Sequence, residues 1–89
     1  MGHDEIQARL RAVIAEVFET TPDALPVGAD TDSVEKWDSL GHLMLIESLE
    51  EAFDVTFGHA ETIEMLSEAD LLERLAARIS ADRVIANSA

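Results

Sequence analysis

Apolar residues recur every three or four positions in three long segments of this 89-residue chain. Such spacing gathers them on one face of an α-helix, whereas a half-buried strand needs strict alternation. Pro22 ends the first segment, because the residue before a proline is pushed out of the helical region. We therefore predict an all-α fold. The apolar face of its first helix consists of Ile6, Leu10, Val13, Ile14, Val17 and Phe18.

The stretch from Thr20 to Asp38 has no helical period and is predicted to be a loop. It contains Pro22, Pro26 and Gly28, together with five acidic residues. A loop this long is uncommon in a small domain. We expect it to have a function or to wrap around the helices.

A second helix is predicted from Asp38 or Ser39, both of which are good N-cap residues, to about Phe53. Its apolar residues divide into two groups at 100° per residue. The core-facing group is Leu45, Ile46, Leu49, Ala52 and Phe53. The opposite side carries Leu40 and Met44, flanked by Leu43, with Glu47 and Glu51. Either the long loop covers this outward side, or it is a docking surface for a partner.

Residues 54–57 alternate like a strand but have no second strand to pair with, so we predict an extended connector that buries Val55 and Phe57. A short third helix is expected from Ala60 to Leu66. The segment from Ser67 to Asp70 resembles a capping box.

The last helix is expected to continue through Leu71, Leu72, Leu75 and Ile79 to about Ser80. The predicted fold is a four-helix bundle of three main helices and the short third one. It forms a single domain over residues 1–89, with an ordered core of about 4–81 and a frayed tail at 82–89.

The chain is strongly acidic, with a formal net charge of −13. Between Ala12 and Glu73, Lys36 is the only basic residue. Such a surface repels phosphate backbones and anionic membranes and attracts basic patches on proteins, although solubility alone also explains it. No apolar run is long enough to span a membrane, and no secretory signal is visible. We expect a cytoplasmic monomer that binds proteins rather than nucleic acid or membrane.

The sequence gives little support for a metal site or for thiol chemistry by the protein's own side chains. Cysteine is absent, so any thiol must come from a cofactor. Asp30-Thr31-Asp32 begins like an EF-hand, but its fifth, sixth and twelfth positions hold Val34, Glu35 and Gly41 instead of the required ligands and glycine. No metal site is predicted. The scattered histidines His3, His42 and His59 are expected to be solvated.

Ser39 is either a helix cap or an attachment point for another group. If Asp38 fills the cap, the Ser39 hydroxyl faces solvent at the first turn, where the helix dipole tolerates a phosphodiester. His42 lies one turn away and could hydrogen-bond to Ser39. A hydrolase also needs an orienting group, an oxyanion hole and a cleft, for which so small a bundle has little room. An acidic bundle that carries nothing is a further alternative.

The triplet Asp38-Ser39-Leu40, followed by leucines and glutamates up to Phe53, resembles the acyl carrier protein family. The resemblance covers nearly the whole chain from Ile6 onward. It implies that Ser39 accepts a 4′-phosphopantetheine arm from coenzyme A, attached by a magnesium-dependent transferase that Asp38 and Leu40 help to recruit. The resemblance also implies a partner-facing surface. This surface consists of Leu40, Leu43, Met44, Glu47, Glu50 and Glu51.

A carrier of this family is not an enzyme. It presents acyl thioesters to acyltransferase, ketosynthase or adenylate-forming enzymes with basic docking patches. Gly41-His42 and Met44 depart from fatty-acid-synthesis carriers, and Trp37 resembles stand-alone carriers of polyketide, nonribosomal or other specialised pathways. The resemblance therefore implies a discrete carrier of a specialised, polyketide-like or polysaccharide-linked pathway. The alternatives are a peptidyl or aryl carrier and a housekeeping fatty-acid carrier. Gly41 weakens the helix, which indicates a close approach near the arm.

Overall fold

The computed structural model describes the backbone of residues 2–88 and the side chains of residues 2–79. Within residues 2–88 it contains four α-helices, one 3-10 turn and no named strand. In chain order the elements are α1 (His3–Val17), η1 (Pro22–Ala24), α2 (Ser39–Phe53), α3 (His59–Glu64) and α4 (Glu68–Ser88). The predicted all-helical fold is confirmed.

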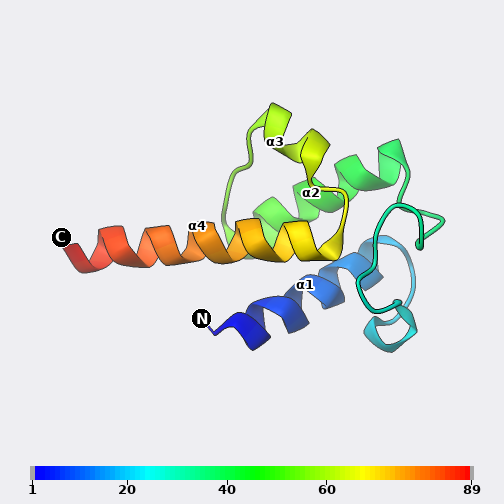
Figure 1. The fold of residues 1–89 in the computed structure, drawn as a ribbon, viewed down its shortest axis with the longest axis horizontal. Coiled ribbons are helices and arrows are strands. Elements are labelled where there is room, and N and C mark those ends of the chain that lie inside the picture. Colours follow the sequence, from blue (N-terminus) through cyan, green and yellow to red (C-terminus); the bar gives the residue numbers. More distant parts are fainter. Residues whose placement is uncertain (1, 89) are drawn as a thin grey trace.

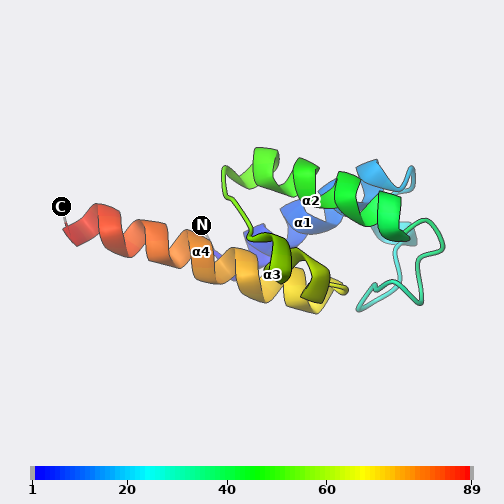
Figure 2. The ribbon, with the colours of Figure 1, turned by 90° about the horizontal axis from the view of Figure 1, so that it is seen from above.

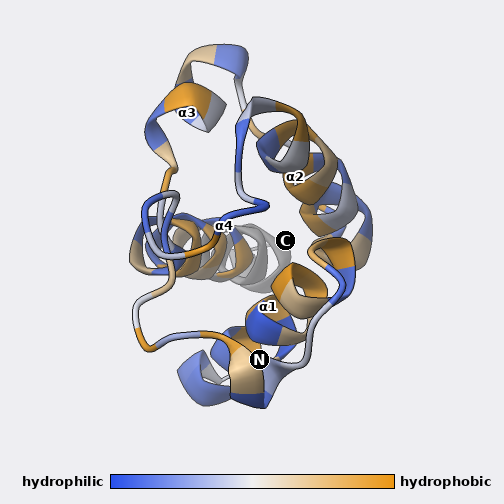
Figure 3. Ribbon diagram, turned by 90° about the vertical axis from the view of Figure 1, so that its right-hand side faces the viewer, coloured by the Kyte–Doolittle hydropathy of each residue, from blue (hydrophilic) through white to orange (hydrophobic). Residues whose placement is uncertain are grey.

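Helix α1 packs against both α2 and α4, and these two helices run in the direction opposite to α1 (Figure 1). The short α3 lies on the side of α4 that faces away from α1 (Figures 1 and 3), and it overlaps α4 when the molecule is seen from above (Figure 2). Seen along the bundle, α1 and α2 each carry both hydrophobic and hydrophilic residues, which is the amphipathic pattern expected for helices that share a core (Figure 3). The helical part of that core is Ile6, Leu10, Ile14, Ala15, Leu45, Ile46, Leu49, Leu71, Leu72 and Leu75.

Helix α1 ends through its own backbone rather than through Pro22. Glu19 adopts the left-handed conformation with φ of 58°. The Thr20 N–H donates to the Ala15 carbonyl at 2.8 Å, and the Glu19 N–H donates to the Glu16 carbonyl at 3.3 Å. These two bonds form a Schellman motif, which satisfies carbonyls that the helix end would otherwise leave unpaired. The helix therefore stops several residues before the proline.

Helix α2 has the bounds that its sequence predicts. Asp38 is the N-cap, and Asp54 ends the helix in the left-handed conformation. The next four residues have no regular secondary structure, with Phe57 buried and Val55 half-buried against the core. The predicted connector is thus confirmed for the burial of Phe57, whereas Val55 is only partly buried. It leads into α3, which is shorter than the predicted range of Ala60 to Leu66 and is followed by the fully buried Met65.

Helix α4 starts where the capping box predicts. The Ser67 hydroxyl accepts a hydrogen bond from the Asp70 N–H at 3.2 Å. The predicted end near Ser80 is wrong, because the helix continues to Ser88 and extends beyond the other helices (Figure 1). Residues 81–88 contain no glycine or proline to stop it. Residue 89 and the side chains of residues 80–88 lie outside the described part, and fraying of 82–89 stays a prediction.

The connection between α1 and α2 lies at one end of the bundle (Figures 1 and 2). Although it has little regular structure, it buries Leu25, Ala29 and Trp37 in the core. The Thr31 N–H donates to the Leu66 carbonyl at 3.3 Å, and the Glu68 N–H donates to the Ala29 carbonyl at 2.8 Å. The segment is therefore fixed both by apolar burial and by pairing with the start of α4.

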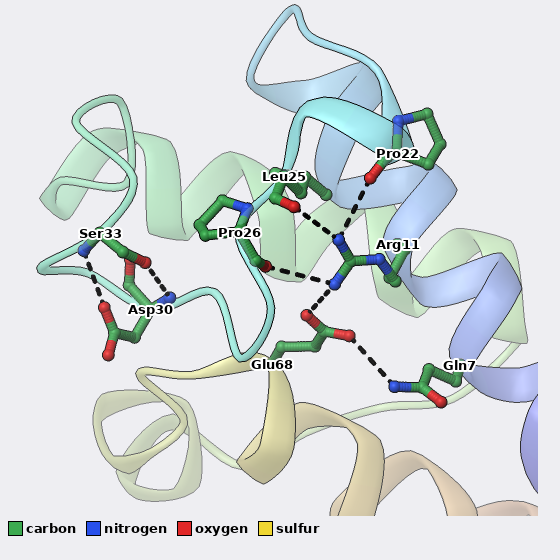
Figure 4. Close-up of polar contacts among 8 residues, drawn as sticks. All are labelled: Gln7, Arg11, Pro22, Leu25, Pro26, Asp30, Ser33 and Glu68. Atoms are coloured by element: carbon green, nitrogen blue, oxygen red, sulfur yellow. Dashed lines mark hydrogen bonds and ion pairs between the residues drawn. The ribbon is translucent and has the colours of Figure 1, made fainter.

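Arg11 holds this connection at its centre (Figure 4). Its guanidinium donates to the carbonyls of Pro22 at 3.1 Å and Leu25 at 2.9 Å. It also pairs with the carboxylate of Glu68, which is only 3% exposed. A carboxylate this buried needs a charged partner, because its desolvation is otherwise costly. Arg11 thus ties α1 and the loop to the start of α4.

Candidate functional site

Ser39 begins α2, and its neighbour Asp38 provides the cap. The Asp38 carboxylate accepts a hydrogen bond from the Gly41 N–H at 2.8 Å, which decides between the two cap residues that the sequence allowed. The Ser39 side chain is exposed, and no hydrogen bond to its hydroxyl is found among the side chains of residues 2–79. Leu40 beside it is 67% exposed. The hydroxyl is therefore accessible and is not needed as the cap of its own helix.

Gly41 lies where the loop crosses closest to α2. A Cβ at this position would lie 2.2 Å from the Lys36 carbonyl oxygen and 2.9 Å from the Phe18 ring. Only glycine fits without a backbone shift, since no carbon approaches a carbonyl oxygen so closely. The close approach expected from the sequence is real, but its partner is the protein's own loop. We attribute Gly41 to this packing rather than to an arm on Ser39.

His42 is held between two other elements, which corrects the prediction that it is solvated. The Trp37 indole donates to His42 Nδ1 at 3.0 Å, and His42 Nε2 lies 2.6 Å from the Thr62 carbonyl oxygen. His3 and His59 are exposed, as predicted. Because both ring nitrogens of His42 have other partners, the conceivable hydrogen bond to Ser39 is absent from the described contacts. Among the described side chains, the hydrogen bond to a base that a serine hydrolase uses is therefore not formed at Ser39.

Two grooves open beside Ser39, and both are lined by Ser39, His42 and Ile63. The larger groove, of about 500 Å³, lies between α2 and α3 and has an apolar lining that includes Ile46 and Phe57. The smaller groove lies toward the loop. Its further lining residues are Thr31, Trp37, Asp38 and Leu66. A group attached to the Ser39 hydroxyl would thus have apolar surface within reach on either side of His42.

The outward side of α2 is open. Leu40, Leu43 and Met44 are 67%, 57% and 48% exposed. The long loop therefore does not cover this side, and that alternative is excluded by the structure. Single exposed apolar residues are common, but three on one turn of helix beside carboxylates form a local apolar patch.

The predicted partner-facing residues lie on two sides of α2. Leu43, Glu47 and Glu50 line the groove toward α3. Met44 and Glu51 line a different groove, between α1 and α2. Its α1 lining residues are Arg9, Val13, Glu16 and Val17. The predicted surface is thus a ridge with a groove on each flank, and α1 contributes to it.

Glu50 has a structural role that the sequence did not indicate. Its carboxylate accepts a hydrogen bond from the backbone N–H of Phe57 at 2.9 Å, and the residue is half-buried. This bond holds the connector after α2 against the helix. Glu50 therefore differs from the exposed Glu47 and Glu51, whose carboxylates face solvent.

The acidic loop uses the carboxylate of Asp30 for its own hydrogen bonds. The Ser33 N–H donates to the Asp30 carboxylate at 2.8 Å, and the Asp32 N–H donates to it at 3.0 Å. The hydrogen bonds from Ser33 hold the pKa of Asp30 below its ordinary value. Within the described residues, no group of three or more histidine, aspartate or glutamate side chains is placed to hold a metal ion.

Three residues have structural roles that the sequence analysis did not identify. Arg11 is partly buried and holds the loop, Trp37 anchors the end of the loop in the core, and Thr62 offers a backbone carbonyl to His42. Trp37 carried a usable signal, because a lone tryptophan at the end of a polar loop is an apolar anchor. Arg11 and Thr62 carried no such signal in the sequence, because their contacts join segments that are distant along the chain.

No helix within the described residues is long and apolar enough to cross a bilayer. Comparison of the whole sequence with known protein families finds no matching family model, and no curated protein matches it.

Proposed function

We propose that the protein is an acyl carrier protein that bears a 4′-phosphopantetheine arm on Ser39 and serves a specialised, polyketide-like pathway. One observation carries the proposal. Asp38 caps α2, and the Ser39 hydroxyl is exposed at the first turn of the helix, beside two grooves, with no hydrogen-bond partner among the described side chains.

The surroundings of Ser39 fit such an arm. The backbone N–H groups at the start of α2 and the positive end of its dipole favour a phosphodiester, even in an acidic protein. When bound, the arm supplies the thiol that this cysteine-free chain lacks, on which acyl groups are carried as thioesters. Apolar residues along the two grooves, including Ile46, Phe57 and Leu66, provide surface for an apolar cargo.

The exposed side of α2 supports a role in docking. Leu40, Leu43 and Met44 would be apolar anchors, and the acidic side chains around them would meet basic patches on partner enzymes. In this proposal the transferase also recognises Asp38 and Leu40. Glu50 is the weakest member of the partner-facing set, because its carboxylate already binds the connector.

Intact-mass measurement tests the proposal. The unmodified protein is incubated with coenzyme A, magnesium and a broad-specificity phosphopantetheinyl transferase. We expect the mass to rise by one phosphopantetheinyl group in the wild type and in Ser67→Ala, which removes the serine at the start of another helix. We expect no rise in Ser39→Ala. An unchanged wild-type mass, or a gain that survives Ser39→Ala, would rule the proposal out.

A loading assay then distinguishes the kinds of carrier. The modified protein is offered to acyltransferases and, separately, to adenylate-forming enzymes that load amino or aryl acids. Acyl loading alone supports the proposed carrier. Loading by the adenylate-forming enzymes alone would instead identify a peptidyl or aryl carrier.

A further inference from the structure

We propose that His42 is a positioning residue, a neutral hydrogen-bond bridge that holds α3 against α2 and keeps the two grooves beside Ser39 separate. The part that concerns cargo rests on the proposed function. The bridge itself is a property of the unmodified protein, and it can be tested without any arm.

The two hydrogen bonds of His42 select one form of its ring. An indole N–H can only donate, so Nδ1 must accept from Trp37. A neutral imidazole that accepts at Nδ1 carries its proton at Nε2, where it can donate to the Thr62 carbonyl. In a doubly protonated ring, Nδ1–H would be a donor that faces the indole N–H of Trp37, which is also a donor. The arrangement therefore admits one tautomer of the neutral ring.

The two ends of the bridge differ in rigidity. Trp37 is 1% exposed and packs against Phe18 with ring centroids 5.7 Å apart, so this end belongs to the core. Thr62 lies in α3, none of whose residues is buried. When a rigid side chain is hydrogen-bonded to a weakly packed helix, the bond fixes the helix rather than the side chain.

His42 also lines both grooves, together with Ser39 and Ile63. Ile46 and Phe57 line only the groove toward α3. Thr62 lines only the groove toward α3, so the bridge from His42 to Thr62 forms part of the wall of the space that a group on Ser39 would enter. If the bridge is lost, the two grooves join, and a bulkier cargo would be admitted.

Amide hydrogen exchange of the full-length unmodified protein tests the bridge. His42→Ala should accelerate exchange of the α3 amides by about threefold to tenfold, the effect of losing one ordinary hydrogen bond. His42→Gln keeps one acceptor and one donor, and its rates should lie nearer to the wild type. His59→Ala is the matched control, because this α3 histidine is exposed, and it should leave the rates unchanged. Unchanged α3 exchange in His42→Ala would overturn the proposal, as would equal rates in the alanine and glutamine variants.

Nitrogen NMR of the His42 ring gives a second readout, which a merely space-filling histidine would not produce. Nδ1 should show the shift of an unprotonated acceptor and Nε2 that of a protonated nitrogen. In His42→Ala the signal of the single Trp37 indole N–H should move. A proton on Nδ1 in the folded protein at neutral pH would contradict the bridge.

The consequence for cargo is tested with an octanoyl group loaded on the Ser39 arm. In the wild type, contacts of the octanoyl protons should be confined to one groove. In His42→Ala they should include both Phe57 and Leu66. The same contacts in both proteins would overturn the role in cargo selection. If no arm can be attached, the proposed function fails, whereas the exchange experiment on the unmodified protein still tests whether His42 holds α3 against α2.

Discussion

Helices α1, α2 and α4 are held together by apolar burial, whereas α3 is held mainly by polar contacts. Leu10, Leu45 and Leu75 are each fully buried between the three long helices. No residue of α3 is buried, and its most apolar residue, Ile63, is 59% exposed. Its apolar anchors lie outside it, in the segments that precede and follow it.

The polar contacts of α3 come from both of its neighbours. Glu61 pairs with Arg74 at 2.9 Å and also with Arg78, both on α4. Arg78 donates to the Thr56 carbonyl at 3.0 Å. His42 on α2 holds the other side. Partly exposed ion pairs and single hydrogen bonds each contribute about 1 kcal/mol or less, while a buried leucine contributes several times as much. We therefore expect α3 to open more readily than the rest of the protein.

The largest expected effect comes from breaking the three-helix core. Leu45→Ala should lower the free energy of unfolding by about 3 kcal/mol, because it removes buried methyl groups and leaves a cavity. Ile63→Ala on α3 is the matched comparison and should change it by less than about 0.5 kcal/mol, because the side chain is largely exposed. Urea denaturation measures both. Similar losses in the two variants would show that α3 belongs to the same packed core.

Gly41→Ala should have the next largest effect. Alanine favours a helix by up to about 1 kcal/mol over glycine. Here the added Cβ would meet the Lys36 carbonyl oxygen at 2.2 Å, and this backbone atom has little freedom to move. Such overpacking costs about 1–3 kcal/mol, so we expect a net loss on thermal and chemical denaturation. A stabilised variant would mean that the loop is not held against α2.

A smaller effect than that of Gly41→Ala is expected from Glu61→Gln, which weakens the attachment of α3 to α4 by less than about 1 kcal/mol. Partial burial raises the pKa of Glu61, but the hydrogen bond from Arg74 and the charge of Arg78 outweigh it and leave this pKa below its ordinary value of 4.5. The stabilisation is therefore complete above that value and is lost as the pH falls through the lower folded-state pKa.

Measuring the free energy of unfolding as a function of pH checks the predicted loss of this stabilisation on acidification. The difference in stability between the wild type and Glu61→Gln should be constant near neutral pH and should shrink below about pH 4.5. α3 amides should exchange faster in the variant, with little change in α1. A stability difference that grows on acidification would contradict the assignment.

The sequence by itself determined the helices, because their periodicity and caps depend on neighbouring residues. It indicated the all-α fold, the span of α2 and the outward position of Leu40 and Met44, and it left the cap of α2 open between Asp38 and Ser39. It failed where local signals compete or are silent. The end of α1 is made by a left-handed glutamate at position 19 rather than by Pro22, and nothing in the sequence stops α4 at Ser80.

Only the tertiary structure decided how the surroundings of Ser39 are built. It showed that the loop leaves the outer side of α2 open, that Arg11 joins the loop to Glu68, and that His42 lies between Trp37 and Thr62. Each of these contacts joins residues from different segments, and their side chains are polar or ambiguous in the sequence. A charged or imidazole side chain takes its role from the partner it meets in the fold, whereas a buried leucine shows its role through its spacing alone.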